Sequence, residues 1–88
     1  MDATGSVVRI GRQQVEALRV GEHLFIQRGE FRGKPQPELS LYLPSYRDDA
    51  REYDLDTWER KAWLSMWKTE LMELLGHRKE IEGFLRSM

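Results

Sequence analysis

The side chains best suited to a specific interaction in this 88-residue chain are aromatic rings and cations that lie between Phe25 and Tyr42. Aromatic rings can stack on the bases of an unpaired nucleic-acid strand, and Arg or Lys side chains can contact its phosphates without reading a sequence. The candidate binding residues are Phe25, Phe31 and Tyr42 for stacking, and Arg28, Arg32 and Lys34 for phosphate contacts.

No arrangement of residues in the sequence is typical of a catalytic or metal site. The chain has no cysteine, and its histidines, His23 and His77, lie far apart. His77 and Glu80 are one helical turn apart, but such pairs are usually solvated neighbours rather than metal ligands. The serines have no recognisable base partner, and the glycines lack the spacing of a phosphate-binding loop. We therefore expect no enzymatic activity, no metal and no other cofactor.

Composition restricts the class of protein further. With 14 basic and 15 acidic side chains, the whole molecule has no strong field that would attract nucleic acid, although the N-terminal half is mildly basic. No apolar run approaches the roughly 20 residues that span a bilayer, and the first residues do not resemble a signal peptide. The absence of cysteine fits a reducing compartment. These features predict a soluble cytoplasmic protein without a membrane partner.

The N-terminal half of the chain has the short, β-branched segments of a sheet. Residues 7–10 predict a strand, and we favour a strand for 15–20, although the composition of that segment also suits a helix. Gly21 and Glu22 are expected to form the two-residue turn of a hairpin, with the glycine at positive φ. The turn would lead into a strand over 23–28.

The next segments alternate between a loop and a strand. Residues 31–37 contain a glycine and two prolines, which predict a loop because proline cannot donate to a ladder of hydrogen bonds. Residues 38–43 alternate cleanly, so Leu39, Leu41 and Leu43 should share one face of a strand.

The alternation also predicts which side chains form the core. In the strand 23–28 the simplest assignment places Leu24 and Ile26 inside. Phe25 would then point outward, and Tyr42 would join it from the neighbouring strand. The expected result is an open sheet face that carries aromatic rings with basic residues around it.

The C-terminal part of the chain is expected to be helical. After a short last strand over 51–55, Asp56 could cap a long helix over 56–75, with Glu59 completing a capping box. Gly76 either ends this helix or lies within it, and a short helix or extension closes the chain.

The predicted long helix has more apolar surface than one sheet can cover. Its tryptophans, leucines and methionines widen the apolar stripe beyond the usual face, which suggests that the helix contacts its own sheet and a second copy of the chain. Dimerisation would also stabilise a domain of this size. The expected dimer-interface residues are Trp63, Met66, Trp67 and Leu71.

Together these segments predict an α+β fold with a single domain over residues 1–88. An antiparallel meander of four to five strands (6–55) would follow a flexible N-terminus (1–5) and precede the helical region (56–88), whose long helix would cover one face of the sheet.

One segment resembles a known family. Phe31-Arg32-Gly33-Lys34, followed by a strand and a helix that contains tryptophan, is similar to the transcriptional coactivator p15 family, also called PC4-like. The resemblance spans residues 24–75. It implies a curved antiparallel sheet, a homodimer and binding of single-stranded DNA in a transcription-associated role. Phe31, Arg32 and Lys34 are the residues that correspond to the family's turn.

The sequence therefore predicts a non-catalytic protein that binds single-stranded nucleic acid. The alternative is a small protein-interaction module, such as an accessory or inhibitor protein, in which the same aromatics and the Trp/Met helix face bind another polypeptide.

Overall fold

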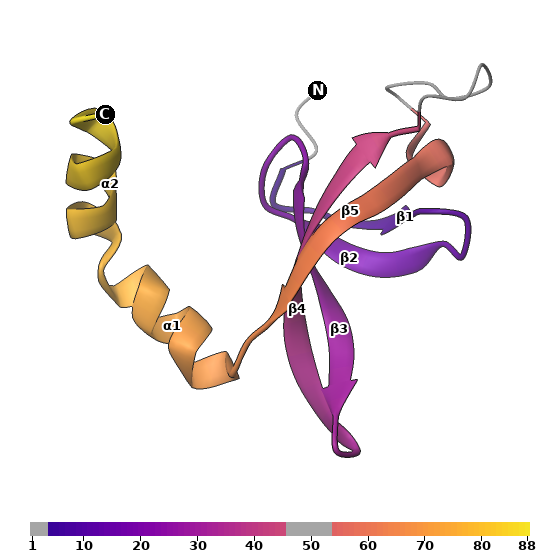
Figure 1. Cartoon of the computed structure of the whole chain (residues 1–88), viewed down its shortest axis with the longest axis horizontal. Coiled ribbons are helices and arrows are strands. Elements are labelled where there is room, and N and C mark those ends of the chain that lie inside the picture. Colours follow the sequence, from indigo (N-terminus) through magenta and orange to yellow (C-terminus); the bar gives the residue numbers. More distant parts are fainter. Residues whose placement is uncertain (1–3, 46–53) are drawn as a thin grey trace.

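A computed structural model describes residues 4–45 and 54–88 of the chain. The strands form one antiparallel sheet in the order β1-β2-β3-β4-β5, and helices follow it (Figure 1), which confirms the predicted α+β class. The elements are β1 (Val7–Ile10), β2 (Val15–Arg19), β3 (Leu24–Phe31), β4 (Lys34–Pro44), the short 3₁₀ helix η1 (Leu55–Thr57), β5 (Trp58–Ser65), α1 (Lys68–Gly76) and α2 (Arg78–Arg86).

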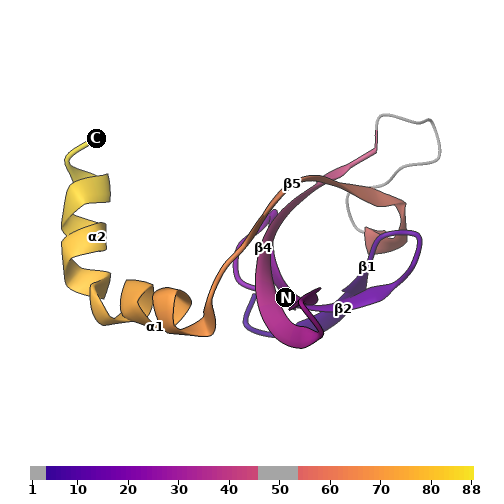
Figure 2. The ribbon, with the colours of Figure 1, turned by 60° about the horizontal axis from the view of Figure 1, so that its bottom comes forward.

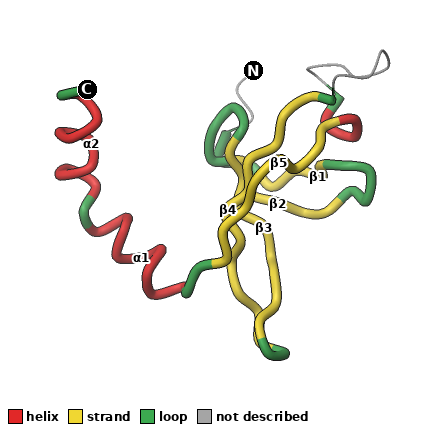
Figure 3. The backbone as a smooth tube through the Cα atoms, in the orientation of Figure 1, coloured by secondary structure: helices red, strands yellow, loops and turns green. Residues whose placement is uncertain are grey.

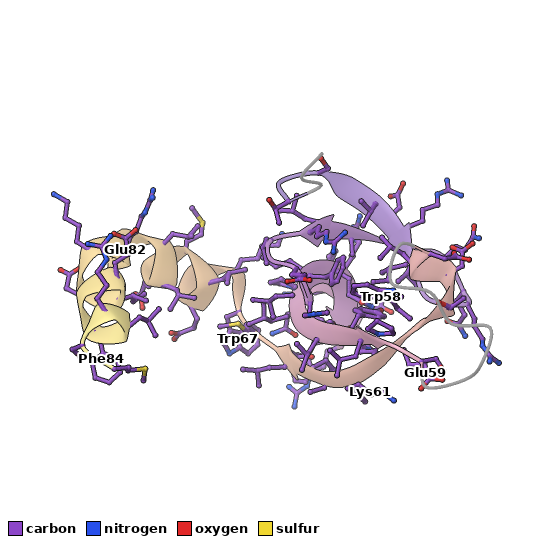
Figure 4. All side chains as sticks on the ribbon, turned by 90° about the horizontal axis from the view of Figure 1, so that it is seen from above. Trp58, Glu59, Lys61, Trp67, Glu82 and Phe84 are labelled. Carbon is purple, nitrogen blue, oxygen red and sulfur yellow. The ribbon has the colours of Figure 1, made fainter. Side chains whose placement is uncertain are left out.

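The sheet curls (Figure 2). Its concave side holds the core, and Figure 4 shows Trp58, a core residue, inside the curl. The Phe25 ring is fully buried and meets the rings of Tyr42 and Trp58 edge to face, with centroids 5.4 Å and 6.3 Å away. Ile10 and Ala17 complete the buried cluster from β1 and β2. A few large rings from several strands thus fill the interior of a small sheet.

The predicted inside and outside of the sheet are reversed. The expectation that Phe25 and Tyr42 lie on an open face is wrong, because their side chains are 0% and 5% exposed. Leu24 and Leu41, opposite each other in the register, are each 37% exposed on the other face. Both faces of these strands are apolar, so alternation alone could not tell which one the curl would enclose.

The predicted loop over 31–37 is mostly regular strand. β3 and β4 pair from Leu24 and Leu41 to Phe31 and Lys34, leaving only Arg32 and Gly33 as a turn. Pro37 is compatible with the ladder because its carbonyl accepts a hydrogen bond from the Met66 N–H at 3.0 Å, on the β5 side. Its missing N–H therefore faces away from β3 and removes no bond between β3 and β4.

The segment 15–20, for which we favoured a strand over a helix, contains strand β2. The connection to β3 is longer than the predicted two-residue turn, since the backbone N–H groups of both Val20 and Gly21 donate to the Leu24 carbonyl. Gly21 is also not among the residues with positive φ. A wider loop does not need the left-handed conformation that a two-residue turn demands.

The first half of the predicted long helix is strand β5 instead. Residues 58–65 pair with β4 from Pro44 and Trp58 to Glu38 and Ser65, with a bulge at Leu41/Tyr42. The open edge of β4 supplies hydrogen-bond partners that outweigh the helical spacing of the apolar residues. The predicted cap is also wrong: the Asp54 side chain caps η1 by accepting from the Asp56 N–H at 3.2 Å.

The helices begin only after the sheet is complete. α1 ends at Gly76, so the chain breaks there, and α2 begins at Arg78. Neither helix contains a buried residue, and both extend away from the sheet (Figures 1 and 3). The expectation that a helix covers one face of the sheet is therefore wrong for the single chain.

The predicted short strand over 51–55 lies largely outside the described residues; Leu55 belongs to η1. Within the described parts of the chain, neither helix has the length and hydropathy needed to cross a bilayer.

Candidate nucleic-acid interface

An aromatic pair marks the place where the β3–β4 hairpin meets the start of α1. The rings of Phe31 and Trp67 contact edge to face, with centroids 5.7 Å apart and planes at 87°. Phe31 is 44% exposed and Trp67 59% exposed, so both rings keep free surface. Figure 4 shows Trp67 at the junction between the sheet and the helices.

The same pair borders a cleft that is rich in cations. The Arg32 guanidinium lies 5.2 Å from the centre of the Phe31 ring, in cation–π contact. Lys34 and Lys68 face the cleft from β4 and α1, and no Asp or Glu is among its lining residues. We name this the hairpin cleft; it is lined by Phe31, Arg32, Lys34, Pro35, Gln36, Trp67, Lys68 and Thr69.

One residue of the hairpin cleft has a buried side-chain amide with an unsatisfied hydrogen-bond acceptor. Gln36 is only 9% exposed, and its Oε1 atom has no hydrogen-bond partner among the residues that the structure describes. Buried polar atoms are nearly always paired, because an unpaired one loses its bonds to water without replacement. The oxygen itself is enclosed, so a ligand in the cleft could donate a hydrogen bond to it only after the Gln36 side chain turns toward the cleft.

The turn that carries Arg32 has an unusual residue in it. Arg32 and Gly33 have φ values of +52° and +77°, the left-handed region that a type I′ hairpin turn requires at both positions. Asn-Gly is the preferred pair for such a turn, whereas arginine pays a steric cost there. The conformation directs the arginine side chain from the tip of the hairpin back over the Phe31 ring.

A further aromatic surface lies along β5 on the concave face. Trp63 is opposite Ser40 and is 57% exposed, and the Arg60 guanidinium is 4.3 Å from the centre of its ring. Arg60 also bonds to Glu38 at 2.9 Å and lies 3.4 Å from the Ser40 hydroxyl. The ion pair with Glu38 holds the guanidinium in place over the tryptophan.

The structure brings together only part of the predicted binding set. Phe31, Arg32 and Lys34 meet at the hairpin cleft. Phe25 and Tyr42 belong to the core and offer no face for stacking. Side chains alternate between the two faces of a strand, so Arg28 points to the same face of β3 as Leu24 and to the opposite face from Phe31.

Sequence reasoning missed Trp67, Lys68 and Gln36 as parts of this site. The helical spacing of 56–75 predicts a helix face for Trp67, whereas Trp58–Ser65 is strand β5. The glycine and two prolines of 31–37 predict a loop for Gln36, whereas the residue lies in β4. Once Trp58–Ser65 pairs with β4, the chain must pass the hairpin tip before α1 can begin. That pairing alone brings Trp67 to Phe31.

Tyr42 has a structural function in this arrangement. Its hydroxyl donates a 2.6 Å hydrogen bond to Gln27 Oε1. Burial raises the pKa of Tyr42 above the usual value of 10.0; Glu38 adds to the increase, whereas Arg60 and the bond to Gln27 oppose it. The residue therefore stays a neutral phenol over the physiological range.

The residues expected at a dimer interface surround the same junction. Trp63 and Trp67 are exposed, whereas Met66 and Leu71 are partly buried, at the end of β5 and the start of α1. His77 and Glu80 lie 3.9 Å apart on the surface, and no cluster of three or more potential metal ligands occurs within residues 4–45 and 54–88.

Comparison of the chain with models of protein families, with curated proteins and with solved structures finds no match.

Proposed function

We propose that the protein binds single-stranded nucleic acid at the hairpin cleft. The observation that carries the proposal is the exposed Phe31–Trp67 pair, flanked by Arg32, Lys34 and Lys68 without an opposing carboxylate among the lining residues. Rings with free surface can stack on unpaired bases, and the cations can contact the phosphates that link them.

The unpaired amide oxygen of Gln36 supports the same proposal. Exocyclic amino groups and ring N–H groups of bases are hydrogen-bond donors, and they are accessible when the strand is not paired. A base stacked against Phe31 or Trp67 would place such donors in the cleft that Gln36 lines. This favours an unpaired strand over a duplex, whose bases are already stacked and paired.

The resemblance of Phe31-Arg32-Gly33-Lys34 to the PC4-like turn supports a transcription-associated role as a regulator. The resemblance and the cleft involve the same three side chains, Phe31, Arg32 and Lys34.

The test is fluorescence anisotropy of a labelled single-stranded oligonucleotide of mixed sequence at low and moderate salt. If three phosphates are contacted, raising the salt from about 50 to about 200 mM should weaken binding about 20-fold. The Arg32→Glu/Lys34→Glu variant should lose most of the affinity, and Trp67→Ala should cost about 1–3 kcal/mol, the contribution of one stacked base. The Gln36→Met variant should bind more weakly while remaining folded.

The matched control is Lys79→Glu/Arg86→Glu, which makes the same change of charge on α2, away from the hairpin cleft. It should bind almost as well as the natural chain. Absence of binding at low salt, or an equal loss in both double variants, would contradict a specific role for the cleft.

A second candidate function is a protein-interaction module. The observation that favours it is the uncovered apolar surface of the sheet and helices, where Leu64, Met72 and Phe84 are 60%, 69% and 67% exposed. Binding through such a surface should tolerate added salt and the Arg32→Glu/Lys34→Glu change, in contrast to nucleic-acid binding.

A further inference from the structure

We infer that the chain forms an exchanged homodimer in which the helices of each copy cover the convex face of the other copy's sheet. We name the helices α1 and α2 (Lys68–Gly76 and Arg78–Arg86) the helical arm. We name the apolar convex side of the sheet the outer face; its members are Leu18, Leu24, Ile26, Leu39, Leu41 and Leu64. The inference does not depend on nucleic-acid binding.

The outer face is a continuous apolar surface. The strand register places Leu18 opposite Ile26, Ile26 opposite Leu39, and Leu39 opposite Leu64. This row crosses β2, β3, β4 and β5, and a parallel row runs from Leu24 through Leu41 to Ala62. Directly opposite residues share a face, so the leucines form one patch rather than scattered side chains. A contiguous apolar patch of this kind marks an interaction surface.

The helical arm has a matching apolar surface, most of which is exposed. Leu71, Leu74 and Leu75 recur at helical spacing in α1, and α2 continues with Phe84 and Leu85. No residue of either helix is buried, and Leu75 and Phe84 are 70% and 67% exposed. Short helices of this length are marginal in water unless an apolar face packs against a partner.

The total surface indicates how much is left uncovered. A compact monomer of 10.5 kDa is expected to expose about 5,400 Å². The chain exposes 7234 Å², about 1,800 Å² more than that expectation. The radius of gyration, 14.4 Å, likewise exceeds the roughly 12 Å expected for this length. An excess of this size is in the range that each subunit of an obligate homodimer buries.

The junction at Trp67 explains why the arm covers a second copy rather than its own sheet. Met66 is hydrogen-bonded to Pro37, and Trp67 packs on Phe31, so both residues between β5 and α1 are held. These contacts direct the arm away from the sheet (Figures 1 and 2). Exchange between two copies leaves both contacts in place.

The base of the arm is continuous with the outer face. Leu71 and Met72 line a shallow cleft together with Ile26, Pro35 and Pro37 from β3 and β4. A partner arm on the outer face would therefore extend an apolar contact that already begins within each chain. Exchange of identical elements about a two-fold axis satisfies both copies at once.

The test uses the absence of cysteine in the natural chain, which lets engineered cysteines report single contacts. Light scattering should first give twice the 10.5 kDa chain mass at micromolar concentration. One batch then carries Leu24→Cys or Leu41→Cys on the outer face, and another carries Leu75→Cys, Phe84→Cys or Leu85→Cys on the arm. After the batches are mixed, unfolded together and refolded, mild oxidation should join a face variant to an arm variant in at least one pairing.

The matched control replaces the arm cysteine by Lys79→Cys, on the polar side of α2, which should cross-link far less with either face position. Phe84→Lys should shift the dimer toward monomer without loss of the sheet signal in circular dichroism, because Phe84 is not part of the core. A monomer at all concentrations would overturn the inference. So would a dimer in which no face–arm pair cross-links, or a chain with both cysteines that closes only on itself.

Discussion

At the scale of single residues, neighbouring aromatics on one strand serve opposite purposes. Phe25 and Phe31 point to the same face of β3. Phe25 is fully buried under Tyr42 and Trp58, whereas Phe31 is 44% exposed beside Trp67. The curl of the sheet encloses the Phe25 end of the strand, and the hairpin tip extends beyond it (Figure 1). Residue type therefore did not distinguish a core ring from an exposed ring.

The raised pKa of Tyr42 predicts how the stability of the fold changes in alkaline solution. Because burial raises its pKa, the folded chain holds the phenol proton more tightly than the unfolded chain does. The free energy of unfolding should be unaffected by this group below the ordinary pKa of about 10 and should fall as the pH rises above it. Tyr42→Phe should lose about 1 kcal/mol at neutral pH with the bond to Gln27, but should decline less above pH 10.

Denaturant unfolding of both proteins at pH values from about 8 to about 11 measures this difference. Parallel curves for the natural chain and the Tyr42→Phe variant would show that Tyr42 does not cause the alkaline loss.

At the scale of elements, the β3–β4 turn holds Arg32, a side chain of the proposed binding cleft, in a strained backbone conformation. Arg32 occupies a left-handed position that asparagine adopts more easily. Arg32→Asn should therefore raise the free energy of unfolding by about 0.5–1 kcal/mol while it weakens binding of single-stranded nucleic acid. Thermal unfolding and the anisotropy titration measure the two effects separately.

The neighbouring change Lys34→Gln is the control for that prediction, because Lys34 is in regular β4 and has no strained backbone to relieve. It should weaken binding without a gain in stability. Equal stability changes in the two variants would argue against strain at Arg32.

At the scale of the whole molecule, the exposed apolar surface predicts that stability depends on protein concentration. If folding of the arm is completed only in a dimer, mass action stabilises the folded state as the concentration rises. The Tm should increase by several degrees over a hundredfold increase in concentration, and Phe84→Lys should remove most of this dependence. A Tm that stays constant over the same range would show that the folded unit is the single chain.

The sequence by itself determined the class of fold and most of the strands. The strands near 7–10, 15–20, 23–28 and 38–43 were predicted because each has β-branched or alternating residues between turn formers. These signals depend only on residues that are close together in the chain. The antiparallel meander and the presence of helices after it could therefore be predicted from the sequence. Phe31, Arg32 and Lys34 could be chosen as candidates for the same reason, since they are adjacent in one turn.

Only the tertiary structure decided which face of the sheet is the core and what residues 58–65 become. Both faces of β3 and β4 are apolar, so the choice between Phe25 and Leu24 depended on the curl of the whole sheet. Apart from its two tryptophans, Trp58–Ser65 has the spacing and the residue types of a helix, and the free edge of β4 decided in favour of the strand. That pairing across the sheet brought Trp67 and Gln36 to the hairpin cleft, because contacts between distant residues are set by topology and not by local propensity.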